Sequence, residues 1–587
     1  MYSAGFIWDD DFYVENNPTF KEEGGLAKIW YPGIDQRDIH PITKQYYPLT
    51  YTSLYLEYQL WGDSPAGYHV VNVLLHIMAA FLLWRVLLQL EIRSAWWGAM
   101  AFAVHPLCVE SVAWITERKN TLSAVFFFAA LLLYLKNRLD TENKPSIKIY
   151  ASVVLLYVFA LLSKSVTCTL PAVMLLLMWW KRPQWKLKSY LHLILLFAIG
   201  LLAGLNTIFM EVNKAKADWD PSIVERLLLV GRTPCFYIQK IIFPDTYMFF
   251  YPRWQLDSSN VYQYLFPLIT LGALLLLWKK AATWGRGPLI AYLIFLALIF
   301  PASGLFNVYP FKFSFVADHF QYLASTAIIV LVVSVLDFYI EKFKQSDCKN
   351  YIFAGLLVML LAKTVFETQK FDTKESLWLD TISKNSECWT AHEELAHYYL
   401  NKGETQRAVV SYQNASAIRS NTDNKALVML ARISDRYGQY DDAVLNYTRY
   451  LAIHPEDSNT KNSLAVALTN NKAYERAEVK FKELIKDHPH SPIYHINYAF
   501  LFSQQGEYEK MVDEYAQVLA LTRKSIITKD TVRIDYVRVL KILEAEQKKI
   551  PDDFVEARKR LQKLLDEFRN SDELLNVIQR DIKTASP

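Results

Sequence analysis

Apolar and polar positions are strongly segregated along this chain. Ten long apolar runs precede residue 366, and amphipathic periodicity follows residue 370. The runs lie at 67–90, 95–110, 121–136, 148–162, 167–180, 189–209, 261–278, 286–302, 321–340 and 350–366. Several are shorter than the ~20 residues that cross about 30 Å of hydrocarbon, so we expect some broken or tilted membrane helices.

The part of the chain after residue 370 repeats every 34 or 35 residues. Turn positions fall at Gly403, Gly438, Lys472 and Gly506, which are spaced 35, 34 and 34 residues apart. Small and aromatic residues recur at fixed distances from these turns: Ala396, Ala431, Ala465 and Ala499; Ala408, Ala443, Ala477 and Met511; Tyr412, Tyr447, Phe481 and Tyr515. This spacing is that of the tetratricopeptide repeat, in which each helix pair buries its face against the next pair. The sequence therefore predicts an α-solenoid here.

Composition supports this division of the chain. The 587 residues are 52% hydrophobic and 14% aromatic, yet they include 63 basic and 59 acidic residues. We predict an all-α protein with four parts: a first external loop at 1–66, a polytopic membrane domain at 67–366, tetratricopeptide repeats at 370–523 and a helical C-terminal cap at 524–587. Pro551-Asp552-Asp553 should begin one helix of the cap. The five widely spaced cysteines indicate neither a disulfide framework nor a metal site.

Basic residues between the apolar runs predict the orientation of the chain. They are Arg138 and Lys144; Lys181, Arg182, Lys186 and Lys188; Lys279, Lys280 and Arg286; and Lys342, Lys344 and Lys349. The positive-inside tendency places these four loops in the cytoplasm, and it places the head, the intervening loops and the repeats on the extracytoplasmic side. The number of membrane crossings agrees with this orientation only if residues 223–243 lie along the membrane surface or re-enter it. An external head also needs an earlier span, so we expect a transmembrane helix before Met1.

Ionisable residues gather on the predicted extracytoplasmic side, in the head and in three loops. Such residues are costly at a membrane boundary, so their convergence predicts a functional site. Because the basic residues otherwise belong to short loops, we expect membrane lipids as neighbours and no nucleic acid. The candidates are Asp9, Asp10, His105, Glu110, Arg118, Lys119, Lys164, Asp318 and His319.

Glycosyl transfer from a polyprenyl-phosphate sugar suits this set of side chains. An acceptor hydroxyl must lose its proton, for which Asp9 or Asp10 could be the general base. The leaving lipid phosphate gains charge, which Arg118, Lys164 and His319 could stabilise. Further site candidates are Glu110, His105, Asp318 and Lys119. We expect no cofactor and no metal ligands, with Mg²⁺ or Mn²⁺ on the carboxylates as the open alternative.

Several motifs together resemble the transmembrane-and-tetratricopeptide O-mannosyltransferase family. They are Gly5-Phe6-Ile7-Trp8-Asp9-Asp10, Tyr47-Pro48-Leu49, Gly67-Tyr68-His69-Val70-Val71-Asn72, the loop from His105-Pro106 to Arg118, Leu161-Leu162-Ser163-Lys164 and the repeats. Around Asp318-His319-Phe320 the chain is more similar to bacterial members, which implies a bacterial inner-membrane protein. The resemblance implies a GT-C glycosyltransferase fold, a lipid-phosphate sugar donor and catalysis by the acidic pair of the first external loop.

Three positions depart from the family pattern. Tyr47 stands where Arg is expected before Pro-Leu, Ser165 stands where an acid often follows Lys, and Asp318-His319-Phe320 replaces an Arg-Tyr pair of animal members. The sugar therefore need not be mannose.

Structural interpretations of the same residues stay open. The aspartates could form a solvated turn or helix cap, the basic residues could reach lipid headgroups, and His105 could be a packing residue. Three functions follow: sugar transfer to extracytoplasmic proteins recruited by the repeat groove, the same chemistry on a cell-surface glycan or lipid, and a non-catalytic scaffold that assembles partners.

Overall fold

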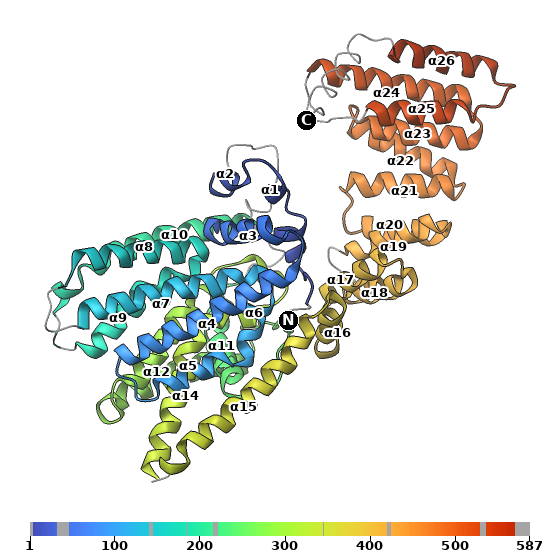
Figure 1. Cartoon of the computed structure of the whole chain (residues 1–587). Helices are drawn as coiled ribbons and strands as arrows, with labels where there is room; N and C mark the ends of the chain where they lie inside the picture. The colour runs from blue at the N-terminus through green and yellow to red at the C-terminus, as the bar shows by residue number, and fades with distance from the viewer. Residues whose placement is uncertain are drawn as a thin grey trace. The chain divides into compact units, whose positions relative to one another are not determined.

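The chain folds into helices. The computed structural model describes residues 4–31, 46–139, 145–182, 184, 186–214, 221–343, 346–419, 424–528 and 536–569, and no strand occurs among them. The all-α prediction is therefore confirmed. The chain divides into two compact units, Met1–Ala391 and His392–Pro587, and each is described by itself (Figure 1).

Each of the ten predicted apolar runs falls on a helix of the first unit. The helices are α4 (Pro65–Gln89), α5 (Ala95–Ala103), α7 (Arg118–Leu139), α8 (Ile147–Ser163), α9 (Leu170–Lys181), α10 (Leu193–Lys214), α12 (Leu265–Trp284), α13 (Gly287–Ile299), α14 (Tyr322–Lys342) and α15 (Lys349–Thr368). As expected from the sequence, α5, α9 and α13 are shorter than a complete membrane span.

Six helical segments in the described part of the chain are long and apolar enough to cross a membrane. They are Pro65–Gln89, Ile115–Leu139, Leu193–Met210, Val261–Trp284, Asp318–Lys342 and Lys349–Phe371. Shorter apolar helices cover Ile147–Ser163, Ser165–Lys181 and Gly287–Ala302. The chain is therefore a multi-pass membrane protein.

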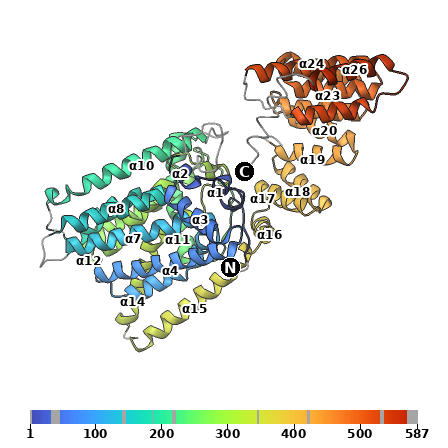
Figure 2. The same cartoon turned by 45° about the horizontal axis from the view of Figure 1, so that its top comes forward.

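The membrane helices pack around a large apolar core. Helices α4, α7 and α8 run side by side in both views (Figures 1 and 2). Phe102 of α5, Tyr134 of α7 and Tyr157 of α8 are completely buried in this core. Helix α11 (Ile223–Ile242), which sequence predicts to lie along the surface or re-enter, is not among the six candidate spans. Ser222 and Glu225 form a capping box at its start.

Short helices of the N-terminal head bring it against the membrane helices. They are a π-helical turn η1 (Asp11–Glu15), α1 (Pro18–Lys21), α2 (Gly25–Trp30) and α3 (Pro48–Trp61). Phe6, Phe20 and Leu54 form a buried cluster with Tyr68 at the start of α4 and with Ile115 of the following loop. This cluster holds the acidic turn of the head near the N-terminal ends of α4 and α7.

Paired helices build the repeat region, and the pattern predicted from sequence is confirmed. Helices α18 (Thr405–Ile418), α19 (Lys425–Arg436), α20 (Tyr440–Leu451), α21 (Ser458–Asn470), α22 (Tyr474–Asp487), α23 (Pro492–Gln505) and α24 (Tyr508–Thr528) follow α16 (Lys374–Lys384) and α17 (Trp389–Asn401). All four predicted turn residues have positive φ, including Lys472 at 58°. Ala431, Ala465 and Ala499 are fully buried, so a larger side chain there would separate the paired helices.

Among the described residues after the repeats, two helices follow, α25 (Tyr536–Gln547) and α26 (Val555–Arg569). The helix expected to start at Pro551-Asp552-Asp553 instead starts at Val555. The Phe554 amide donates to the Pro551 carbonyl, so these residues form a turn before the helix. Leu543, Leu561 and Leu565 continue the buried core of the repeats. Residues 529–535 and 570–587 of the predicted cap lie outside the described residues.

Candidate functional site

A strained turn presents the acidic pair of the head. Trp8 has φ of 45°, a left-handed conformation that costs a non-glycine residue roughly 1–2 kcal/mol. Its ring makes edge-to-face contacts with Phe249, Phe250 and Trp378, at centroid distances of 6.4, 5.6 and 5.2 Å. These contacts hold the backbone in place immediately before Asp9.

Asp10 anchors this turn to the loop that begins α7. Its Oδ1 accepts hydrogen bonds from the backbone amide and the hydroxyl of Thr116, at 2.8 and 2.9 Å, and its Oδ2 accepts from the Ile7 amide at 3.1 Å. Burial raises the pKa of the Asp10 carboxyl to about 7, against the lowering effect of these bonds. Asp9, in contrast, is half-buried.

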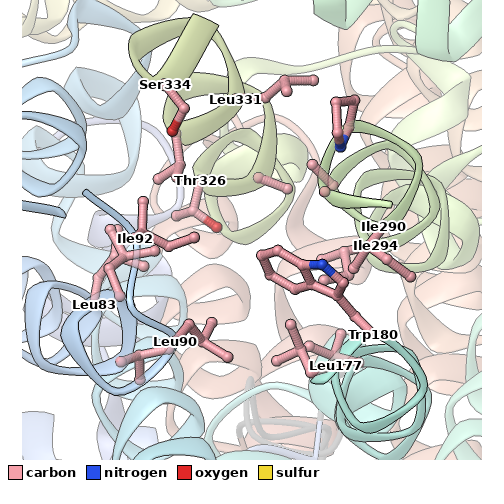
Figure 3. A pocket seen from close by; sticks show the side chains of 18 of the residues that line it. Leu83, Leu90, Ile92, Leu177, Trp180, Ile290, Ile294, Thr326, Leu331 and Ser334 are labelled. Atoms are coloured by element: carbon pink, nitrogen blue, oxygen red, sulfur yellow. The ribbon is translucent and has the colours of Figure 1, made fainter. Parts of the chain in front are cut away.

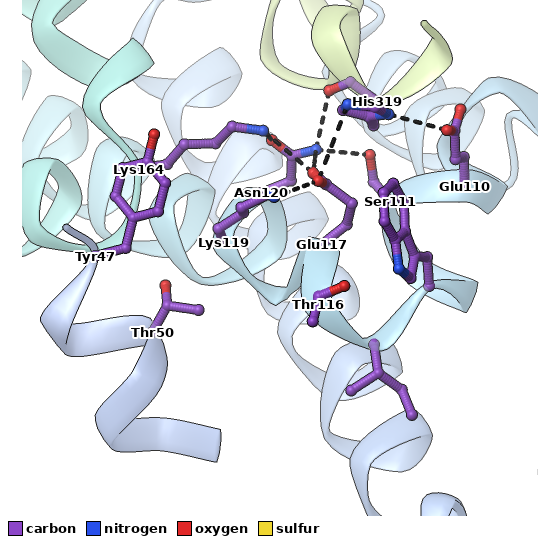
Figure 4. Close-up of polar contacts among 12 residues, drawn as sticks. Tyr47, Thr50, Glu110, Ser111, Thr116, Glu117, Lys119, Asn120, Lys164 and His319 are labelled. Carbon is purple, nitrogen blue, oxygen red and sulfur yellow. Dashed lines mark hydrogen bonds and ion pairs between the residues drawn. The ribbon is translucent and has the colours of Figure 1, made fainter. Parts of the chain in front are cut away.

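Three polar side chains form a network around Glu117, the last residue of η4 (Ile115–Glu117) (Figure 4). The Lys119 ammonium lies 2.8 Å from Oε1 of Glu117, and the Lys164 ammonium lies 3.1 Å from Oε2. Asn120 donates to Oε2 at 2.7 Å and accepts from Lys164 at 2.7 Å. Glu117 is completely buried, and its two ion pairs fix the positions of both lysine ammonium groups.

A histidine–carboxylate pair joins this network from another part of the chain. His319, in η10 (Asp318–Gln321), places Nδ1 2.9 Å from Oε1 of Glu110, in α6 (Val109–Ala113). Its Nε2 lies 4.0 Å from Oε1 of Glu117. The His319 backbone carbonyl also accepts a hydrogen bond from Asn120 at 2.9 Å. The structure thus brings together Glu110, Lys119, Lys164 and His319, four of the residues predicted from sequence.

Burial affects the charge state of Lys164. Only 13% of its side chain is exposed, and this burial lowers the pKa of its ammonium to about 8, although the charge of Glu117 acts in the opposite direction. Close to neutral pH the ammonium therefore carries a proton that it can lose at moderately alkaline pH.

A cavity of about 480 Å³ starts at this network and continues between apolar side chains. Its polar end includes Glu117, Lys119, Lys164 and His319. The other end is apolar, and Leu201 and Leu205 of α10 line it while more than half of each side chain is exposed. The cavity therefore connects a cluster of cations with the outer, apolar face of α10. Its further apolar lining includes Phe197, Ile208, Phe300, Phe306 and Phe320.

Close helix packing shapes the apolar end of this cavity. Gly200 of α10 lies so near the preceding helices that a Cβ atom there would meet the Tyr157 hydroxyl at 2.3 Å and the Cys168 carbonyl at 2.9 Å. Only glycine permits this approach, so α10 lies directly against η5 (Ser165–Thr169), which follows Lys164.

Arg118 lies outside the network, although it is the neighbour of Glu117. Its side chain is completely buried, and its guanidinium forms an ion pair with Glu57 of α3. It also donates to Asn72, to Ser53 at 2.8 Å and to the Tyr68 carbonyl at 2.9 Å. All three guanidinium nitrogens are engaged within the protein, so Arg118 joins α3, α4 and α7.

His105 and Asp318 also have partners outside the cavity. His105 accepts from the Leu107 amide at 3.3 Å, and its Nε2 lies 3.1 Å from the Ile241 carbonyl, which joins η3 (Pro106–Cys108) to α11. Both oxygens of Asp318 lie within 3.0 Å of the Tyr251 hydroxyl. Both side chains are buried, so they support the walls of the site.

Two positions that depart from the family pattern are in contact. The Tyr47 hydroxyl lies 3.4 Å from Oγ of Ser165, and both residues line the cavity. Next to them, Thr50 donates to the Ser163 carbonyl at 3.0 Å. The head therefore reaches the segment that carries Lys164, with neutral groups where a basic and an acidic residue were expected.

The described residues include no group of three or more His, Cys, Asp or Glu side chains arranged to hold a metal ion. Both oxygens of Asp10 accept protein hydrogen bonds, and Glu110 is paired with His319. The expectation that the protein needs no cofactor stays a prediction.

Sequence reasoning did not select three residues that build this site. Glu117 stands before two basic residues, a signal that could have identified it as their common partner. Asn120 follows one turn later and shares that signal. Glu57 carries no sequence signal, because a lone acid in an aromatic-rich helix does not indicate which buried cation it meets.

The fold and this site define an all-α multi-pass membrane protein with tetratricopeptide repeats. No family model matches the chain. The protein O-mannosyl-transferase F38B6.6 of Caenorhabditis elegans is 25% identical over 426 residues, which cover 70% of this chain and 59% of that protein. The protein O-mannosyl-transferase TMTC4 of Mus musculus is 30% identical over 176 residues, covering 27% and 24%. TMTC3 of Mus musculus is 32% identical over 141 residues, covering 23% and 15%.

These relatives confirm the resemblance to the transmembrane-and-tetratricopeptide O-mannosyltransferase family. The chain spans less than two thirds of the length of each of these three relatives. Among solved structures, the TPR protein YrrB aligns at 16% identity and a TM-score of 0.24, covering 32% of this chain and 92% of YrrB. Yeast Tom70 aligns at 12% identity and a TM-score of 0.22, covering 87% and 92%. Because these scores are below 0.5, the repeat assignment rests on the helix pattern of the chain itself.

Proposed function

We propose that this protein is a membrane glycosyltransferase that moves a sugar from a polyprenyl-phosphate donor to hydroxyl groups of extracytoplasmic proteins. The observation that carries the proposal is the cavity beside Lys164, which is cationic at one end and apolar along α10 at the other. A polyprenyl-phosphate sugar has the same division, with a charged phosphate next to a long hydrocarbon chain. The protein O-mannosyl-transferase relatives support the same class of reaction.

In this reaction an acceptor oxygen attacks the anomeric carbon of the donor sugar. A new carbon–oxygen bond forms to the acceptor, and the bond from the anomeric carbon to the phosphate oxygen breaks. The bonding electrons leave with the polyprenyl phosphate, and the acceptor proton passes to a carboxylate. We assign that carboxylate to Asp9, which is half-buried and so can be reached by an acceptor, whereas Asp10 is completely buried.

The leaving phosphate gains negative charge, and three side chains at the cationic end would stabilise it. Lys119 and Lys164 each have N–H groups beyond those directed at Glu117, and His319 has Nε2 available on the side opposite Glu110. Preorganised donors of this kind require little rearrangement during the reaction. Of the three residues first assigned to the phosphate, Lys164 and His319 keep that role, Lys119 joins them, and Arg118 is assigned to support the fold.

The acceptor is inferred from the predicted orientation and the repeats, whereas the donor is inferred from the cavity. The predicted orientation puts the cationic end of the cavity and the repeats on the extracytoplasmic side, where the repeat groove would recruit a protein acceptor. We place the protein in a bacterial inner membrane, as its resemblance to bacterial members suggests. A cell-surface glycan or lipid acceptor is the alternative that keeps the same donor chemistry.

The enzymatic proposal is tested by substitution at the cationic end. Purified protein in detergent is supplied with a radiolabelled polyprenyl-phosphate sugar and a mixture of extracytoplasmic proteins, and label in protein is measured. Lys164→Met should reduce transfer at least about 100-fold, whereas Lys148→Met, a lysine exposed at the start of α8, should leave it unchanged. Equal transfer by both variants would disprove the assignment, and no transfer by unmodified protein with any sugar tested would favour a scaffold.

The acceptor is tested by deletion of residues 370–587. Transfer to proteins should fall strongly in the truncated protein, while hydrolysis of the donor by water continues in the membrane unit. Unchanged transfer to a glycan or lipid acceptor would instead support the alternative, because such an acceptor has no need of the repeats.

A further inference from the structure

A second cavity lies in the membrane unit, away from the cationic network (Figure 3). Its volume is about 700 Å³, and helices α4, α7, α9, α13 and α14 enclose it. On α14 it extends from Thr326 to Tyr339, whereas His319 precedes the start of that helix. At 1.5 Å per residue this stretch is about 20 Å long, so the cavity follows the helix along roughly two thirds of the ~30 Å hydrocarbon core.

The lining of this cavity offers hydrocarbon contacts and almost no free polar groups. Side chains such as Leu83, Leu177 and Ile294 point into it (Figure 3). The hydroxyls of Thr326 and Ser334 are engaged within the protein: Thr326 donates to the Leu323 carbonyl at 2.7 Å, and Ser334 lies 3.0 Å from Oγ of Ser94. A polar ligand would lose its hydration here without replacement, so the site favours an alkyl chain.

Exposure increases from one end of the cavity to the other. Leu83 and Phe127 are 4% and 2% exposed at the closed end, whereas Trp284 and Phe338 are 58% and 61% exposed at the open end. In a membrane protein those exposed apolar residues face lipid. The cavity is therefore closed at its floor and open toward the bilayer at the ends of α12 and α14.

Cations surround the open end. The Arg286 guanidinium lies over the Trp179 ring at 5.5 Å, Lys280 lies 5.9 Å from the Trp284 ring, and Lys342 lies 5.9 Å from the Tyr339 ring. In the described part of the chain, these three cations form no ion pair with a carboxylate.

The acids nearby already have basic partners. Glu91 is 3.3 Å from Lys181, Asp337 pairs with Lys349, and Glu341 pairs with Arg93 and Lys349. The unpaired charge at the mouth of the cavity is thus positive. Basic residues combined with aromatic residues beside a hydrocarbon slot suit an anionic lipid headgroup.

We propose that this cavity is a binding site for an anionic phospholipid. One acyl chain occupies the slot between α13 and α14, and the phosphate lies against Arg286 and Lys280. The site is separate from the glycosyl-transfer site, and it does not depend on the proposed reaction. A bound lipid would fill a void that otherwise leaves the lining side chains without packing partners.

The first test uses unmodified full-length protein in nanodiscs that contain equal amounts of phosphatidylglycerol and phosphatidylcholine. Native mass spectrometry after release should show phosphatidylglycerol retained at least fivefold over phosphatidylcholine. Phosphatidylglycerol with a photoreactive acyl chain should crosslink to peptides of α13 and α14. Equal retention of the two lipids, or crosslinks confined to other helices, would overturn the proposal.

Two variants with matched controls separate the headgroup from the acyl chain. Arg286→Gln should bring the retention ratio close to one, whereas Lys188→Gln, at an exposed position of the short helix η6 (Leu187–Tyr190), should keep it. Ala291→Phe fills the cavity and should reduce retention of both lipids at least fivefold, while Leu276→Phe on the exposed face of α12 should not. Unchanged lipid retention by Ala291→Phe would contradict the proposed position of the chain. Because the crosslinking uses unmodified protein, it gives an answer even if this variant misfolds.

Discussion

His319 Nδ1 lies 2.9 Å from Oε1 of Glu110, a hydrogen bond between residues 209 positions apart in the chain. The bond fixes the ring so that Nε2 points away from Glu110 and lies 4.0 Å from Oε1 of Glu117. The Glu110 carboxylate thus sets the orientation of the imidazole ring. In the proposed reaction Glu110 would therefore be a positioning residue for His319, whose Nε2 would face the donor phosphate.

Substitution of either member of this pair should reduce transfer by different amounts. His319→Ala removes the phosphate contact and should lower kcat about 100-fold. Glu110→Gln keeps a hydrogen-bond acceptor but loses the charge. A hydrogen bond to a charged group is worth about 1.5–3 kcal/mol and a neutral one about 0.5–1.5 kcal/mol, and the difference of roughly 1–1.5 kcal/mol should lower kcat about tenfold. Steady-state transfer assays check both values, with Glu225→Gln at the start of α11 as an acidic control. Wild-type kcat for Glu110→Gln would contradict the positioning role.

The pH dependence of transfer should report Lys164. The lysine is protonated below its pKa of about 8 and neutral above it, and a neutral amine cannot offset the phosphate charge. We therefore expect kcat/KM to fall as the pH rises through about 8, since this ratio reports groups of the free enzyme. Lys164→Arg keeps its charge at all these pH values, so its kcat/KM should decline only at higher pH. An unchanged decline near pH 8 in this variant would assign the titration to another group.

Sequence patterns predicted the helices and the repeats because both depend on local periodicity. Ten apolar runs became ten helices, and the turns at Gly403, Gly438, Lys472 and Gly506 all have positive φ. The sequence pattern predicts the start of α26 too early. Pro551-Asp552-Asp553 has the residue types typical of a helix start, but these residues form a turn before the helix.

Tertiary partners of charged residues could not be predicted in this way. The sequence places Glu117, Arg118 and Lys119 side by side, yet Lys119 faces the cavity and Arg118 enters a buried pair with Glu57. Successive residues on a helix point in different directions, so adjacency in sequence does not indicate a shared site. The partner of each charge depends on which distant helix packs against that face.

Arg118→Ala should prevent stable folding, in keeping with its burial. The change leaves the Glu57 carboxylate without its cation in a buried position, which costs about 3–5 kcal/mol. Replacing both residues together, with Arg118→Met and Glu57→Leu, should recover most of this loss because no charge stays buried. Thermal unfolding of the purified variants in detergent measures the effect.

The same double variant tests whether Arg118 binds the donor. If Arg118 only supports the fold, the refolded double variant should have nearly the donor KM of the unmodified protein. A stable double variant whose donor KM rises 100-fold would show that Arg118 does contact the phosphate.

The contact between Tyr47 and Ser165 predicts coupled substitutions. Tyr47→Arg alone puts an uncompensated cation beside Lys164, and Ser165→Asp alone adds a carboxylate that competes for that lysine. Together they can form an ion pair at the same contact. A double-mutant cycle on thermal unfolding should therefore give a favourable coupling of about 0.5–3 kcal/mol. Additive effects of the two changes would show that the residues do not interact in solution.

Asp9 and Asp10 should differ in what their loss does to the protein. Asp9→Asn keeps the size of a half-buried side chain, so it should change stability by less than about 1 kcal/mol, and it should reduce transfer about 10²–10⁴-fold as expected for a general base. Asp10→Ala removes three hydrogen bonds from the turn and should destabilise the protein by roughly 2–4 kcal/mol. Thermal unfolding and transfer assays on the same preparations compare the two variants.

Asp10 should also make stability depend on pH. Its pKa is about 7 in the folded protein and 3.8 ordinarily, so the folded state binds this proton more tightly than the unfolded chain does. The free energy of unfolding should therefore fall as the pH rises from about 4 to about 7, by up to ~4 kcal/mol at ~1.4 kcal/mol per pKa unit. Asp10→Asn has no proton to lose, so the stability of unmodified protein relative to this variant should be greater at pH 5 than at pH 8. A difference that is the same at both pH values would show that the carboxyl is already ionised at pH 5.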